Sequence, residues 1–140
     1  MHRLNIVRLV LGGLTSGVIL FIVMSVTNGV ILAREWAALG AQMLTVFPNL
    51  PAGGYGLALF FIQEILAGLV GAFVYAGIRG WVGYNLRAAW ISAVVIWAAG
   101  WGLLTLDKLA SGIQPEKLIY YNLLAALLGC STRAAAARAR

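Results

Sequence analysis

Glu64 is the residue with the clearest potential for chemistry, because it is the only ionisable side chain well inside a long apolar run of the sequence. A carboxylate within the hydrocarbon of a bilayer is costly unless it is protonated, paired with a cation or in contact with water. Other polar side chains at comparable depth or close by are Gln63, Asn28, Asn122 and Thr105. We therefore predict a polar cluster in the outer third of a helical bundle, where Arg34 or Lys117 could reach inward to the acid.

This predicted cluster has two interpretations. The first is a site for a proton, a cation or a polar ligand. The second is a set of interhelical hydrogen bonds that fixes the register of the helices, at about 0.6 kcal/mol for each contact. The second is favoured, because a relay of protons would need a further acid or a histidine beside Glu64, and the sequence offers neither at that depth.

Other chemistries find little support in the sequence. His2 is the only histidine and Cys130 the only cysteine, so we expect no metal ligand set, no cofactor, no disulfide and no catalytic triad. Cys130 is expected to be a small buried side chain. The net charge of +6 comes from scattered basic residues rather than from a basic stripe, which argues against nucleic acid as a partner. The protein is therefore predicted not to be an enzyme.

Composition points to a membrane protein. Hydrophobic residues make up 62% of the 140 residues and charged residues only 10%, against about 45–50% and 25% in soluble domains. Four apolar runs predict an all-α, antiparallel bundle of four transmembrane helices in a single domain, 1–140. The expected spans are 9–33, 55–78, 88–106 and 115–132. The last run is short and reaches across only if its helix begins near Pro115, a residue favoured at the first helical position.

The distribution of basic residues predicts the orientation of the spans. With the N-terminus inside, the cytoplasmic segments hold seven basic residues, Arg3, Arg8, Arg79, Arg87, Arg133, Arg138 and Arg140. The opposite side holds three, Arg34, Lys108 and Lys117. An excess of Lys and Arg marks the cytoplasmic side. We therefore expect both termini in the cytoplasm and a multi-pass protein of the bacterial inner membrane.

The outer loop, 34–54, is the longest segment between spans. Its apolar residues at helical spacing are Trp36, Leu39, Met43 and Val46 or Phe47. Either the first helix continues past the membrane and folds over at Pro48 and Pro51, or a separate helix lies on the outer leaflet. We favour the first alternative, because the segment shows no charged face to sit in water.

Small residues at four-residue spacing predict close contacts between the helices. They are Gly13 and Gly17 on the first span, Ala67, Gly68, Gly71 and Ala72 on the second, and Ala125 and Gly129 on the fourth. The expected anchors at the cytoplasmic interface are Arg79, Trp81, Tyr84, Arg87 and Trp90. Trp97 and Trp101 form a bulky stripe deeper in the third span, which indicates packing rather than a pigment or quinone site.

Three short segments resemble a loose group of small, uncharacterised bacterial membrane proteins. These segments are residues 8–13 (Arg-Leu-Val-Leu-Gly-Gly), 28–33 (Asn-Gly-Val-Ile-Leu-Ala) with Trp36 after it, and 75–79 (Tyr-Ala-Gly-Ile-Arg) with Gly83 and Ala88-Ala89 after it. Members often have proline where this chain has Gly80, and a glutamate in the middle of the first helix, which is absent here. The resemblance implies a four-helix bundle in a bacterial inner membrane.

These observations predict a non-catalytic accessory or assembly subunit that packs laterally against other integral membrane subunits and lipids, or against further copies of itself. A respiratory or photosynthetic complex would suit it as a host. The alternative is a small transporter or channel-like oligomer that uses Glu64.

Overall fold

The computed structural model describes residues 5–49, 56–83 and 86–136, and within these ranges the chain is helical apart from short connections. In chain order the elements are α1 (Ile6–Val26), the π-helical turn η1 (Thr27–Ile31), α2 (Ala33–Val46), α3 (Gly56–Val82), α4 (Leu86–Trp97), the π-helical turn η2 (Ala98–Gly102), α5 (Leu103–Ser111) and α6 (Glu116–Ala136). The prediction of an all-α chain is confirmed for the described residues.

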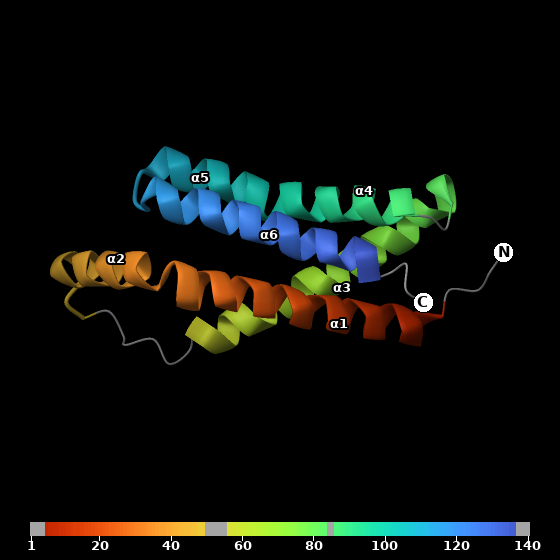
Figure 1. The fold of residues 1–140 in the computed structure, drawn as a ribbon, viewed down its shortest axis with the longest axis horizontal. Coiled ribbons are helices and arrows are strands. Elements are labelled where there is room, and N and C mark those ends of the chain that lie inside the picture. Colours follow the sequence, from red (N-terminus) through yellow and green to blue (C-terminus); the bar gives the residue numbers. More distant parts are fainter. Residues whose placement is uncertain (1–4, 50–55, 84–85, 137–140) are drawn as a thin grey trace.

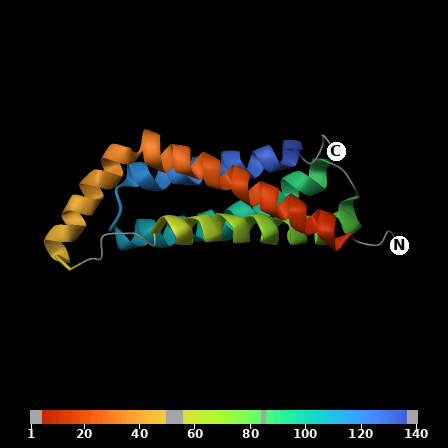
Figure 2. The ribbon, with the colours of Figure 1, turned by 90° about the horizontal axis from the view of Figure 1, so that it is seen from below.

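Four long rods lie side by side (Figures 1 and 2). Helices α1 and η1 form the first rod, α3 the second, α4 with η2 and α5 the third, and α6 the fourth. Three rods are long and apolar enough to cross a membrane, namely Ile6–Ile31, Gly56–Val82 and Leu86–Ser111. They coincide with the predicted spans 9–33, 55–78 and 88–106, so the protein is a helical membrane protein.

Helix α6 forms where the fourth apolar run was predicted. The amide of Ile119 donates a hydrogen bond to the carbonyl of Pro115 at 3.3 Å, so the proline stands immediately before the first helical residue. Because proline has no amide hydrogen to lose there, it is well suited to open a helix. Helix α6 runs along both α1 and α4 (Figure 1).

The interior of the bundle holds small and branched apolar side chains where α1, α4 and α6 meet. Leu20 and Met24 of α1 pack on Ala125 and Ala126 of α6, while Ala93 and Ile96 of α4 pack on Cys130. Cys130 is fully buried, which confirms its expected packing role. Trp97 and Trp101 are partly buried against both clusters, as predicted for a packing stripe. The indole Nε1–H of Trp97 donates to the carbonyl of Leu123 at 2.9 Å.

The chain bends at Leu32, well before Pro48 where the favoured prediction placed the turn. Leu32 has φ −106° and ψ 13°, outside the helical region, and it separates the π-helical turn η1 from α2. Figure 2 shows α2 turned away from the axis of α1 at the end of the bundle. The prediction of an unbroken first helix was therefore wrong. The wider π-helical turn changes the direction of the backbone without help from proline.

Helices α3 and α5 both extend beyond the predicted ends of their spans. Helix α3 includes Arg79 and Trp81 and ends at Val82, where Gly83 at φ 89° closes the last turn by donating its amide to the carbonyl of Arg79 at 2.9 Å. Helix α5 likewise continues to Ser111 and ends at Gly112, at φ 61°. Glycine adopts this left-handed conformation without a steric penalty, and it stops both helices for that reason.

Candidate functional site: a buried glutamate beside a glycine crossing

Glu64 is fully buried on α3, about 12 Å along the helix from Gly56 at a rise of 1.5 Å per residue. Its face of α3 also carries the buried Gly68, one turn further on. That face meets α1 at Gly17, where an added Cβ atom would lie 2.9 Å from the carbonyl oxygen of Glu64 and 2.6 Å from the Cα atom of Ile65. The acid therefore lies on the helix face where the backbones of α1 and α3 approach most closely.

Three glycines make this approach between α1 and α3 possible, and we call it the glycine crossing: Gly13, Gly17 and Gly68. A Cβ atom at Gly13 would lie 2.9 Å from the Cα atom of Leu69. One at Gly68 would lie 2.7 Å from the Cα atom of Gly17. Real Cβ atoms do not approach backbone so closely, so each of these three positions requires glycine. Close backbone approach through small residues is a main source of helix association in lipid.

The other predicted packing residues lie at or near the same interfaces. Ala67, Gly71 and Ala72 on α3 are half-buried, and Ala125 and Gly129 on α6 are buried. Ala67 and Ala125 belong to the cluster around Leu20, and a Cβ atom at Gly129 would collide with the Leu20 side chain. The small residues of α6 thus bring it against α1, as those of α3 do.

The residues of the predicted polar cluster differ in exposure and in their hydrogen-bond partners. Gln63 is exposed, because one residue along a helix turns a side chain by about 100° from its buried neighbour Glu64. Thr105 is buried. Among the described residues, no hydrogen bond joins Asn28, Asn122 and Thr105 to one another. Instead, the amides of Asn28 and Asn122 donate to carbonyls four residues back on their own helices, Met24 at 2.9 Å and Leu118 at 2.8 Å.

Asn28 has a second contact that the sequence does not reveal. Its side-chain oxygen accepts a hydrogen bond from the indole Nε1–H of Trp36 at 2.7 Å, across the bend at Leu32. Trp36 is thus more than an apolar residue at helical spacing, because it fixes the start of α2 to the end of the first span. A pairing between residues on either side of a non-helical position depends on the angle of the bend, which composition and periodicity do not encode.

Lys117 and Glu35 form an ion pair between the first turn of α6 and the first turn of α2. Lys117 was one of two cations, with Arg34, expected to be able to reach Glu64, and its ammonium group lies on Glu35. The hydrogen bond from Lys117 lowers the pKa of Glu35 below its ordinary value of 4.5. Both side chains are partly exposed, so the pair is screened by salt and contributes little stability by itself.

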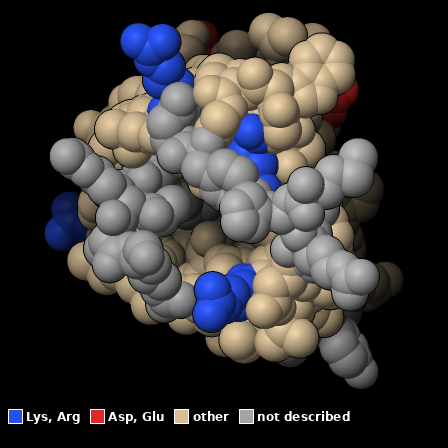
Figure 3. Space-filling model, turned by 90° about the vertical axis from the view of Figure 1, so that its right-hand side faces the viewer, with Lys and Arg blue, Asp and Glu red and all other residues tan. Residues whose placement is uncertain are grey.

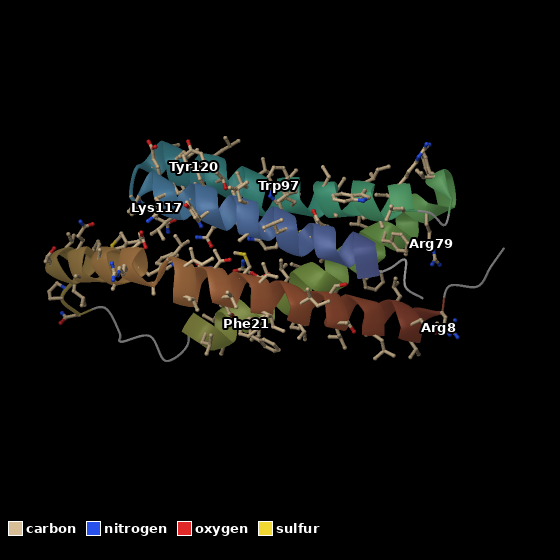
Figure 4. All side chains as sticks on the ribbon, viewed as in Figure 1. Arg8, Phe21, Arg79, Trp97, Lys117 and Tyr120 are labelled. Carbon is tan, nitrogen blue, oxygen red and sulfur yellow. The ribbon has the colours of Figure 1, made fainter. Side chains whose placement is uncertain are left out.

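The predicted interfacial anchors gather at the opposite end of the bundle. Figure 4 shows Arg8 and Arg79 at one end and Lys117 at the other. Trp81, in the last turn of α3, is 94% exposed, and Arg87 and Trp90 are exposed in the first turns of α4. Figure 3 shows Lys and Arg side chains at several places around this end of the molecule. Tyr84 lies outside the described residues.

The fold and the site together define a class: a helical membrane protein with three helices long and apolar enough to cross a membrane, one of which carries a fully buried carboxyl group. Comparisons with protein-family models, with curated proteins and with solved structures gave no match.

Proposed function

We propose that α6 is a fourth span, and that both termini face the cytoplasm of a bacterial inner membrane. Two observations support this. The first turn of α1 and the last turn of α6 lie at the same end of the bundle (Figure 1). Seven of the ten basic residues belong to segments at that end in a four-span topology, and an excess of basic residues marks the cytoplasmic side.

We further propose that the protein is a non-catalytic accessory or assembly subunit of a larger membrane complex. The observation that carries this proposal is the outer surface of the bundle. Large apolar side chains are exposed along α1, α3, α4 and α6, among them Ile22, Phe73, Val94 and Leu128. Such a surface suits lipid and the flanks of other membrane subunits, respiratory or photosynthetic complexes included. The polar side chains of the spans mostly bond to their own helices, as those of Asn122 and Ser92 do.

Several glycines with open space beside them make this proposal testable. A Cβ atom at Gly77 of α3 or at Gly100 of η2 would meet nothing within 4 Å. We therefore expect a leucine at either position to be tolerated by the bundle but to obstruct a partner helix packed against that face. Affinity purification of the tagged protein from its native membranes in mild detergent, followed by native electrophoresis and mass spectrometry, should recover defined membrane polypeptides. We expect Gly77→Leu or Gly100→Leu to release them while the helical content stays unchanged.

A lone monomer from the wild-type protein, with no companion polypeptide, would contradict the proposal. Gly12→Leu on α1, another open position, is a third variant that extends the test to a second helix. Loss of partners with one of the three variants would identify the face that binds them. Equal recovery of partners with all three would exclude these faces from the contact.

A small transporter or channel-like oligomer is the second candidate function, and the complete burial of Glu64 within a span favours it. Acids within membrane spans often mark ion or proton pathways. The test is flux of protons or monovalent cations into liposomes that contain the purified protein. A flux that depends on pH and disappears in Glu64→Gln would support transport, and an absence of flux in the wild-type protein would rule it out for these ions.

A further inference from the structure

The rotation of α2 about its own axis is fixed by three contacts near its start. Leu39 is buried in a cluster with Leu32 and Leu118. Trp36 donates its indole hydrogen to Asn28. Glu35 forms an ion pair with Lys117 of α6. Because a helix held on two neighbouring elements cannot turn freely, the residues that α2 presents to its surroundings are set by the fold.

With this rotation, α2 carries two strips of side chains on opposite sides. The apolar strip consists of Trp36, Gly40 and Leu44, followed by Phe47 immediately after the end of the helix, and the polar strip consists of Arg34, Gln42 and Thr45, with Ala38 between the first two. Each polar-strip residue lies two positions before its apolar counterpart, which is about 200° around a helix. Leu44 and Phe47 are 53% and 56% exposed, although both are large apolar side chains.

Helix α2 begins where the first span ends. The span closes at Ile31, only Leu32 intervenes, and α2 then turns away from the span axis (Figure 2). Val30 and Ile31, the last residues of the span, are themselves exposed and apolar. The exposed apolar surface of the span therefore continues directly into α2, at the level where the span leaves the hydrocarbon.

We infer that α2 lies in the interface of the bilayer, with its apolar strip inserted between phospholipid headgroups and acyl chains and its polar strip toward water. An amphipathic helix with aromatic and aliphatic residues on one side and an arginine on the other binds lipid in this way. The tryptophan at the start of the strip suits the headgroup level. This inference depends on α1 crossing the membrane and is independent of any role as an accessory subunit.

The test uses a pair of positions, two residues apart in the sequence, that face opposite sides of α2. Nitroxide labels are attached to Leu44→Cys and Gln42→Cys in the full chain, reconstituted into vesicles of phosphatidylethanolamine and phosphatidylglycerol. The wild-type protein is the labelling control, because its Cys130 is buried. Power saturation then compares the accessibility of each label to oxygen, which concentrates in hydrocarbon, and to a nickel chelate, which stays in water.

The expected result is an oxygen-to-nickel ratio at least about threefold higher at residue 44 than at residue 42, because only the apolar side of an interfacial helix contacts acyl chains. Similar ratios with high nickel access at both positions would place α2 in water and overturn the inference. Low access to both reagents at residue 44, with spin–spin broadening, would show a second copy of the chain on the strip and would also overturn it. The pair Phe47→Cys and Thr45→Cys repeats the comparison if either first variant fails to fold.

Discussion

Gly68→Ala should loosen the contact between α1 and α3. The added Cβ atom would lie 2.5 Å from the amide nitrogen of Gly17, whereas ordinary contacts begin near 3.4 Å. The two backbones would have to separate by at least this difference, about 0.9 Å, because the carbonyl oxygen of Gly13 lies closer still. The position of the Cβ atom is fixed by the backbone of α3 and the atoms that it meets belong to the backbone of α1, so no side-chain rotation can relieve the clash.

The size of the effect follows from two opposing contributions. Overpacking a well-packed contact costs about 1–3 kcal/mol. Replacing glycine by alanine inside a helix recovers about 0.5–1 kcal/mol of backbone entropy. The expected net loss in the free energy of unfolding is therefore between about 0 and 2.5 kcal/mol. Titration of the protein from mild detergent into SDS, followed by circular dichroism and tryptophan fluorescence, measures this free energy.

Gly77→Ala is the matched control, because it makes the same chemical change on the same helix at a position with nothing within 4 Å. Only the entropic contribution remains there, so we expect no loss of stability and a gain of up to about 1 kcal/mol. If Gly68→Ala proved as stable as Gly77→Ala, the close backbone approach at the glycine crossing would be refuted as the basis of α1–α3 association.

Three further predictions concern other contacts. Because the pKa of Glu35 is lowered, the ion pair that holds α2 on α6 is formed at any pH above the ordinary pKa of 4.5 and is lost as the pH falls through the lowered pKa. A spin label at Gln42 should therefore gain mobility on acidification, and Glu35→Gln should abolish that pH dependence. Trp97→Phe removes a hydrogen bond to α6 and should lower the free energy of unfolding in the SDS titration by about 1 kcal/mol. Trp90→Phe, at an exposed position, should leave this free energy unchanged, and equal losses in the two variants would count against a contribution of the hydrogen bond. Cys130 is buried and should react with a maleimide at least about a hundredfold more slowly in mild detergent than in SDS, as expected for a group reached only through opening of the fold; comparable rates would show that α6 is not packed as described.

The spans could be predicted from the sequence because hydropathy over about 20 residues depends only on which residues are present. The residues at which the spans end were harder to predict. Helix α3 continues past the predicted end at Ile78 because the arginine and tryptophan that follow can occupy the headgroup region without leaving the helix. The bend at Leu32 was missed because no proline marks it, and because Gly29, in the π-helical turn before it, was interpreted as part of the first span. Backbone packing produces it, through a π-helical turn.

For the candidate site, the sequence predicted how far along each span a residue lies, but not to which side of the helix its side chain points. Depth along a span located Glu64, Asn28 and Asn122 in one half of the bundle, but it could not tell which way each side chain points. Gln63 and Glu64 have nearly equal depth, and one is exposed while the other is buried. The ion pair of Glu35 and Lys117 joins residues 82 positions apart in sequence, and nothing short of the packing of α2 on α6 brings them together.

The burial of Glu64 follows from the glycine crossing. The acid and Gly68 share one face of α3, and the backbone around Gly17 covers that face because no Cβ atom keeps it away. Any larger residue at the crossing would separate the helices and allow lipid or water to approach the carboxyl group.

The two candidate functions therefore require opposite behaviour of one contact, the glycine crossing between α1 and α3. A subunit that serves as a structural partner needs the crossing to stay closed, so that the acid remains part of a rigid core. A transporter needs the crossing, or the contact with α6 beside it, to open in each cycle so that the carboxyl group can exchange its proton or cation. Stability and flux measured together on variants of the crossing would therefore separate the two functions, because only in a transporter would a loosened crossing change the rate of transport.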